Sequence, residues 1–183
     1  MIMSKRTKFS TSKNDEYYTP KYGVEIILPY VKKEWKTIWC PFDKEWSNYV
    51  IMLKEMGYNV IHTHIDEGYD FLKYEPSFEF DAIITNPAFS IKNETIKKCM
   101  EYKKPFCLLL PFTMFFSKRS IQTVAEGGSD GVQFLMIDDR ISFNGERANF
   151  NTWYIGGNHF FDKDINVYLF EESPIKLWHL ENK

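Results

Sequence analysis

The chain of 183 residues is long enough for one domain with a sizeable core, and an apolar content of 44% excludes an intrinsically disordered protein. The net charge of −2 gives no overall electrostatic case for binding nucleic acid, so any such binding has to be local. Three cysteines without CxxC spacing favour a reducing compartment over disulfides or structural zinc. The sequence shows neither a signal peptide nor an apolar run near the roughly 20 residues of a membrane span. We therefore expect a cytoplasmic protein with no membrane attachment.

The polar and basic residues 1–14 predict a flexible arm, and residues 15–183 predict a single domain. Within that domain, apolar residues recur at helical spacing in some segments, while β-branched residues dominate others. Glycine or proline separates many of these segments. The patterns predict helices over 22–31, 47–56, 93–103 and 120–126, and strands over 37–39, 59–65, 81–85, 106–110, 132–137 and 152–155.

This alternation predicts an α/β protein with a mostly parallel sheet and helices on both faces. The last two predicted strands have no helix between them, so we expect them to pair antiparallel. Residues 139–151, which connect these two strands, are expected to form a loop or hairpin.

A side-chain amide directly follows the predicted strand 81–85, in the tetrapeptide Asn86-Pro87-Ala88-Phe89. Open α/β sheets bind ligands at the carboxyl ends of their strands. An amide and an aromatic ring at that edge suit a planar nitrogenous base, because the amide bonds to the edge of the base and the ring stacks on its face. Asn-Pro is also a common turn signal, and taken alone it favours a structural interpretation.

The tetrapeptide resembles the signature of adenine-N6 DNA methyltransferases that use S-adenosylmethionine, which reads Asn or Asp, Pro, Pro, then Phe or Tyr. Ala88 departs from that signature. Small phage and mobile-element members combine it with Pro-Phe-Asp after the first strand and Thr-His-Ile in the second strand, and both are present here. The resemblance implies a Rossmann-like methyltransferase fold: a mostly parallel seven-stranded sheet with an antiparallel last strand.

The same resemblance implies a cofactor site. Tyr18-Thr19-Pro20 looks like the motif that touches the methionine end of the cofactor. Pro41-Phe42 matches the motif of the first strand, but Cys40 stands in the acidic position and the usual glycine-rich loop is missing. Asp43 is then the expected acceptor of the cofactor's ammonium group. His64 and Asp66 lie where the family binds the ribose, and Asp70-Phe71 looks like the pair that binds the adenine ring.

The resemblance also implies the catalytic roles. The Asn86 side-chain oxygen and the Pro87 carbonyl would accept hydrogen bonds from the adenine amine, and Phe89 would stack on the base after it leaves the duplex. Ala88 predicts a looser loop and slower chemistry. Arg140, Arg147 and Asn149 would lie on the nucleic-acid side.

Other interpretations remain open. His62, His64 and Asp66 alternate along one strand in a pattern that a metal ion could use, but we favour polar residues at a strand end and predict no metal. The chain could be a catalytically degenerate binding protein, or it could methylate RNA adenine or protein glutamine. A nucleotidyl-sugar enzyme is disfavoured, because no phosphate-binding loop is found. The chain has no room for a target-recognition domain, so we expect a short DNA site, many sites, or a partner subunit.

Overall fold

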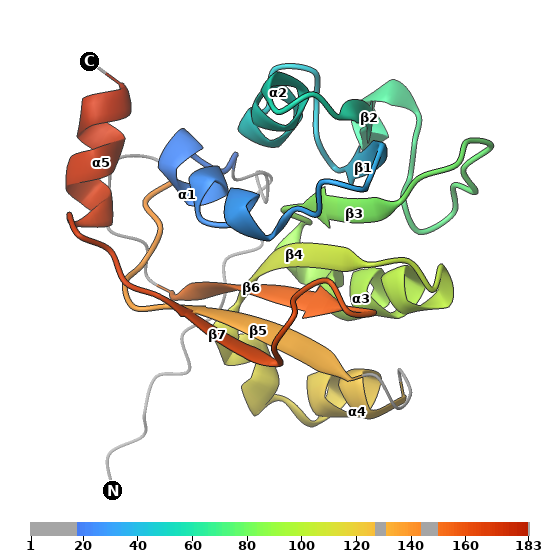
Figure 1. The fold of residues 1–183 in the computed structure, drawn as a ribbon. Coiled ribbons are helices and arrows are strands. Elements are labelled where there is room, and N and C mark those ends of the chain that lie inside the picture. The colour runs from blue at the N-terminus through green and yellow to red at the C-terminus, as the bar shows by residue number, and fades with distance from the viewer. Residues whose placement is uncertain (1–17, 127–130, 144–149, 183) are drawn as a thin grey trace, which may run out of the picture.

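A single sheet of seven strands organises the computed structural model, which describes residues 18–126, 131–143 and 150–182. The arm predicted over 1–14 lies outside the described residues. The strand order is β2-β1-β3-β4-β6-β5-β7, with β2 at one end of the sheet and β7 at the other (Figure 1). The strands are β1 Thr37–Pro41, β2 Asn59–Thr63, β3 Ala82–Thr85, β4 Phe106–Pro111, β5 Val132–Ile137, β6 Thr152–Gly157 and β7 Ile165–Tyr168.

The strand directions confirm the mostly parallel sheet. Strands β1 to β4 pair in parallel, and β6 lies antiparallel between β4 and β5. Strand β6 corresponds to the predicted strand 152–155, which we expected to be antiparallel because no helix is predicted between it and the strand before it. Strand β7, which pairs in parallel with β5, was not predicted, because it is only four residues long and lies between charged residues.

The described helices are α1 Lys21–Glu25, α2 Asn48–Glu55, α3 Lys92–Glu101, α4 Lys118–Glu126 and α5 Pro174–Glu181. The prediction of one helix over 22–31 was wrong in length, since α1 ends early and a 3-10 turn follows at Leu28–Tyr30. Pro29 explains the break, because it has no N–H for a helical bond and disfavours helical geometry in the residue before it. Helix α5 was not predicted. None of the described helices is both long and apolar enough to cross a membrane.

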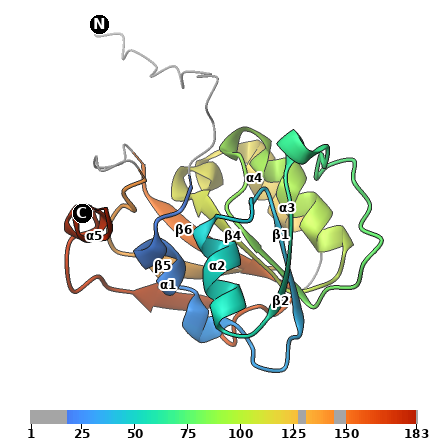
Figure 2. The same ribbon diagram turned by 90° about the horizontal axis from the view of Figure 1, so that it is seen from above.

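Two cores lie on the two faces of the sheet, because successive strand residues point to opposite sides. In β3, for example, Ile84 belongs to the core under α1 and α2, whereas Ile83 belongs to the core under α3. Figures 1 and 2 show α5 beside α1 on the first of these faces. Such close packing on both faces holds the strand ends in fixed positions.

An aromatic segment, residues 68–80, connects β2 to β3 and covers part of the α3 face. Its rings surround Trp39 of β1, with ring centroids 5.3 Å away at Phe71 and 5.1 Å away at Phe80. The Trp39 ring N–H donates to the Thr63 hydroxyl at 3.0 Å. This packing makes the segment part of the core on the α3 face, although it contains neither a helix nor a strand.

Candidate active site

The largest gathering of predicted site residues lines one pocket at the carboxyl ends of β1, β2 and β3. These strands are parallel neighbours, so their ends meet at the same edge of the sheet. The pocket has a cavity volume of about 80 Å³ and opens to solvent. Its lining consists of Tyr18, Thr19, Phe42, Asp43, His64, Ile65, Asn86, Pro87, Ala88 and Phe89.

Asp43 places a buried carboxyl in the pocket wall, directly after β1. Asp43 is only 4% exposed, and the Thr85 hydroxyl donates a hydrogen bond to Asp43 Oδ2 at 2.7 Å. Burial raises the pKa of Asp43 to about 7, while hydrogen bonds from Thr85 and Ser47 oppose the rise. A carboxyl in this state favours a cationic ligand, because a neighbouring positive charge stabilises its ionised form.

The turn that carries Asp43 contains no glycine. Phe42 takes a positive φ of 71°, in the left-handed region that glycine adopts most easily. Its ring lines the pocket and packs on Phe71, with centroids 5.0 Å apart. This ring contact helps to stabilise a positive φ, which is unfavourable for any residue other than glycine. Phe42 lines the pocket and Phe71 does not, so Phe42 lies between the pocket and Phe71.

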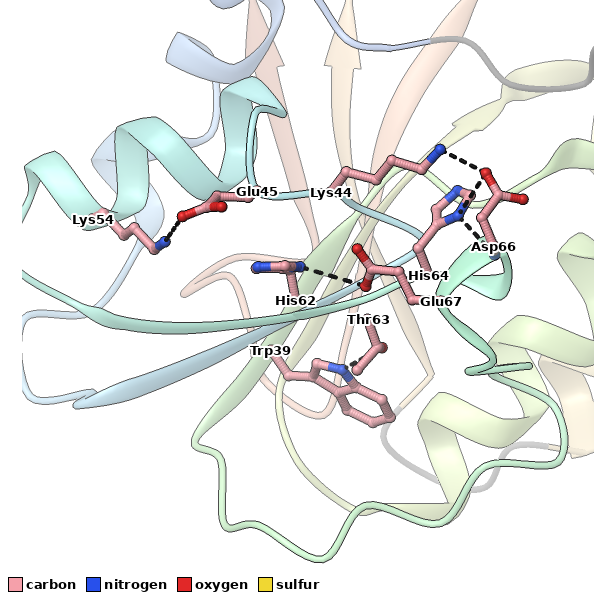
Figure 3. Close-up of polar contacts among 9 residues, drawn as sticks. All are labelled: Trp39, Lys44, Glu45, Lys54, His62, Thr63, His64, Asp66 and Glu67. Atoms are coloured by element: carbon pink, nitrogen blue, oxygen red, sulfur yellow. Dashed lines mark hydrogen bonds and ion pairs between the residues drawn. The ribbon is translucent and has the colours of Figure 1, made fainter.

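His64 reaches the pocket from the end of β2, where a network of polar contacts holds it (Figure 3). Its Nδ1 accepts the backbone N–H of Asp66 at 3.1 Å, so the neutral ring carries its hydrogen on Nε2. The Asp66 carboxylate lies 3.5 Å from the same Nδ1 and 2.6 Å from Lys44 Nζ. The hydrogen bond from Lys44 holds the pKa of the exposed Asp66 below its usual value. This network links the ends of β1 and β2 beside the pocket.

Tyr18 and Thr19 close another side of the pocket and are fixed by several elements. The Asn48 side chain of α2 donates to the Thr19 carbonyl at 2.9 Å, and the Tyr18 ring packs against Trp46. Helix α1 approaches Thr19 so closely that a Cβ on Gly23 would lie 2.9 Å from the Thr19 methyl group. Only glycine therefore leaves Thr19 where it is.

The beginning of α1 is held in turn by the last helix. The Glu181 carboxylate accepts the backbone N–H groups of Lys21 and Tyr22, at 3.0 and 2.6 Å. Each of these donors would otherwise be one of the free N–H groups at a helix start. Helix α5 thus stabilises the segment that follows the Thr19 turn.

The tetrapeptide itself leaves β3 and enters a short 3-10 turn at Phe89–Ile91. Ala88 has φ −56° and ψ 125°, close to the angles that a proline ring imposes. The Phe89 ring meets the Phe150 ring edge-on at a centroid distance of 5.5 Å. A proline at position 88 would therefore fit the backbone of this loop without a change of φ.

Other predicted residues do not line the pocket. Pro20 and Pro41 are buried behind it, and Asp66 lies beside it. Asp70 pairs with Lys73 at 2.8 Å, which lowers the Asp70 pKa, and Phe71 is buried against Trp39 and Phe42.

On the predicted nucleic-acid side, the Arg140 Nε donates to the Asn151 side chain at 2.9 Å. Arg147 and Asn149 lie outside the described residues.

Sequence reasoning missed Ser47 and Thr85, which hydrogen-bond the Asp43 carboxyl. Ser47 had been assigned only to a helix start, and Thr85 only to a strand. The single available signal was the position of Thr85 directly before Asn86.

The residues of the possible metal pattern do not come together. His62 points away from His64 and lies 3.9 Å from Glu67 (Figure 3). Among the described residues, no three His, Cys, Asp or Glu side chains come together in a way that could hold a metal ion.

Comparison with known proteins adds support for the fold. No family model and no curated protein matches the sequence. The structure is similar to the crystal structure of the 23S rRNA methyltransferase ErmE, with a TM-score of 0.52 and 11% identity over 78% of this chain and 69% of that one. It is also similar to a chain from a type I restriction-modification system, with a TM-score of 0.54 and 11% identity, covering 87% of this chain and 46% of the other. At such low identity the similarity concerns architecture, and it shows that the chain has the Rossmann-like methyltransferase fold.

Proposed function

We propose that this protein transfers a methyl group from S-adenosylmethionine to the N6 amine of adenine in DNA. The observation that carries the proposal is that one pocket joins the tetrapeptide after β3 to residues from three predicted cofactor motifs. Those motifs are separated by long stretches of sequence, yet Thr19, Asp43 and His64 all meet Asn86 there. The parallel sheet brings Asp43, His64 and Asn86 to one edge, and the segment before α1 adds Thr19 to them.

The pocket residues fit the chemistry of this cofactor. The buried Asp43 carboxyl suits its ammonium group, and the Nε2–H of His64 suits a ribose hydroxyl as acceptor. The sequence predicts that the adenine ring of the cofactor rests on Phe71. Phe42 lines the pocket and packs on Phe71, so we propose that Phe42 offers the aromatic surface instead. When bound, the cofactor supplies an electrophilic methyl group on a positively charged sulfur.

Asn86 and Pro87 are proposed to position the accepting amine. The adenine amine is a poor nucleophile, because its lone pair is delocalised into the ring. Hydrogen bonds to the Asn86 side-chain oxygen and the Pro87 carbonyl favour pyramidal geometry at the nitrogen and make the lone pair available. The reaction then depends more on alignment than on acid-base catalysis. Phe89, whose ring packs against Phe150, is proposed to stack on the flipped base.

We place the DNA on the side of the 139–151 loop, with Arg140, Arg147 and Asn149 as proposed contacts. We propose that recognition uses a short DNA site, many sites or a partner subunit. The similarity to a chain of a type I restriction-modification system is compatible with a partner, but it shows only the fold.

A second candidate is a methyltransferase-fold protein that binds the cofactor without transferring the methyl group. Ala88 and the missing glycine-rich loop favour it, because both depart at the site itself from the motifs that the sequence otherwise resembles. Methylation of RNA adenine or protein glutamine shares the same pocket chemistry and differs only in the substrate.

The test has two stages. Calorimetric titration with S-adenosylmethionine and with its demethylated product measures binding, and radiolabelled methyl transfer to DNA, RNA and glutamine peptides measures activity. We expect micromolar binding and N6-methyladenine in DNA digests. Asn86→Ala should abolish transfer while changing cofactor affinity less than threefold, since a lost hydrogen bond to substrate does not touch the cofactor. Binding without transfer to any substrate would support the second candidate, and an active Asn86→Ala protein would refute the mechanism.

A further inference from the structure

Within the part of the chain that the structure describes, strand β7 forms an open edge of the sheet. Among the described strands it pairs only with β5, at the end of the sheet opposite β2 (Figure 1). The Asp164 and Tyr168 carbonyls accept the backbone N–H groups of Phe134 and Asp138 of the β5 segment, at 2.7 and 3.2 Å. Backbone groups alternate in direction along a strand, so those of residues 165, 167 and 169 point outward to the open edge.

The side chains of the same three residues form an exposed apolar row. Ile165, Val167 and Leu169 are 62%, 60% and 67% exposed, and the segment 165–170 contains neither a charged residue nor a proline. Proteins usually protect an edge strand with charges, prolines or covering segments, because an open edge is a template for pairing with another chain. This edge combines outward backbone groups with an unprotected apolar row.

We propose that a second copy of the chain pairs with this edge, strand β7 against strand β7, antiparallel about a two-fold axis at Val167. A self-complementary interface of this kind brings the same patch of both copies together. In this register Val167 faces its own copy and Ile165 faces Leu169. The outward backbone groups of residues 165, 167 and 169 then exchange hydrogen bonds across the axis.

Charge selects this register over its neighbour. The exposed Lys163 and Glu171 flank β7 on its two sides, so a pairing centred on Val167 brings Lys163 of one copy toward Glu171 of the other, and the symmetry makes this attractive pair twice. The acidic residues one position further from the axis, Asp162 and Glu172, also come toward each other in this register. Each of them already forms an ion pair with a lysine of its own chain. Asp162 lies 3.8 Å from Lys32, and Glu172 lies 2.6 Å from Lys176. A shift of one residue in either direction would set outward backbone groups against inward ones, and in one of the two directions it would also bring Asp162 toward Glu171.

The pairing leaves the candidate active site open. The pocket is at the ends of β1, β2 and β3, and β4, β6 and β5 separate those strands from β7. Since the two copies of β7 run in opposite directions, the two pockets open at opposite edges of the joined sheet. The proposal therefore concerns assembly and stands independently of the proposed methyl transfer.

Sedimentation velocity of the full chain from about 1 to 100 μM tests the proposal. We expect reversible dimerisation. Lys163→Glu and Glu171→Lys should each weaken the dimer about tenfold, because two attractive pairs become two repulsive ones, and the double variant should restore it. Val167→Lys should abolish the dimer, and Ile121→Lys, at a half-exposed residue of α4, is the matched control and should leave it intact. Circular dichroism confirms folding of each variant. A chain that stays monomeric at 100 μM, or charge variants that dimerise like the parent, would overturn the proposal.

Discussion

Replacing Asp43 by asparagine should weaken cofactor binding and at the same time stabilise the protein. The change keeps the shape of the side chain and removes its charge. Burial raises the pKa of Asp43 to about 7, whereas the pKa of an aspartate in an unfolded chain is about 3.9. Between those values the folded protein binds a proton that the unfolded chain has released, so stability falls as the pH rises from about 4 to about 7.

The size of this effect follows from the shift. Three pKa units correspond to roughly 4 kcal/mol, which is an upper limit for the destabilisation that Asp43 causes above pH 7. We therefore expect Asp43→Asn to raise the melting temperature at pH 7.5 by several degrees. The matched control is Asp81→Asn at the other end of β3, where the backbone N–H groups of Thr37 and Lys36 lower the carboxyl pKa. That variant removes the same charge and should lower the melting temperature.

Cofactor binding should move in the opposite direction. Loss of a hydrogen bond between charged groups typically costs about 1.5–3 kcal/mol, so Asp43→Asn should weaken S-adenosylmethionine binding roughly 10- to 100-fold. In the parent, the ionised fraction of Asp43 rises about fivefold from pH 6 to pH 7, and the affinity should follow it. Calorimetric titration at both pH values measures this. A variant that binds as tightly as the parent, or a parent whose affinity is flat over that range, would refute the assignment of Asp43 to the ammonium group.

Substitutions at three further positions test two residues that line the pocket and one residue of α1 that packs against Thr19. His64→Ala should weaken cofactor binding about fivefold, and His64→Gln, which keeps an N–H donor, should weaken it less; equal losses measured by titration would contradict a hydrogen-bonding role. Gly23→Ala should lower the free energy of unfolding, measured by urea denaturation, by about 1–2 kcal/mol and should weaken cofactor binding, because the new Cβ displaces Thr19. Unchanged cofactor binding would contradict a role of α1 in positioning the pocket residue Thr19. Ala88→Pro should be accommodated at φ −56°, stabilise the chain by about 0.5 kcal/mol and speed methyl transfer; a rate no faster than the parent's would contradict the looser-loop explanation.

Local patterns in the sequence were sufficient for the central strands and most of the helices. Apolar runs and capping residues mark these elements over short distances, as Ser47 does by accepting the Val50 N–H at the start of α2. The position of Asn86 at the carboxyl end of a strand also followed from local sequence alone. Because parallel strands share one edge, this position already indicated where the candidate site lies.

Tertiary structure decided the features that depend on contacts between distant segments. Phe71 looked like a ligand-facing ring, but its burial between Trp39 and Phe42 depends on how residues 68–80 fold over the sheet. The pKa of Asp43 likewise results from burial together with Thr85, which lies 42 residues further along the chain. The Glu181 contact with α1 joins residues 159 and 160 positions apart. No local pattern encodes such contacts, since each depends on the packing of the whole domain and on the water that this packing excludes.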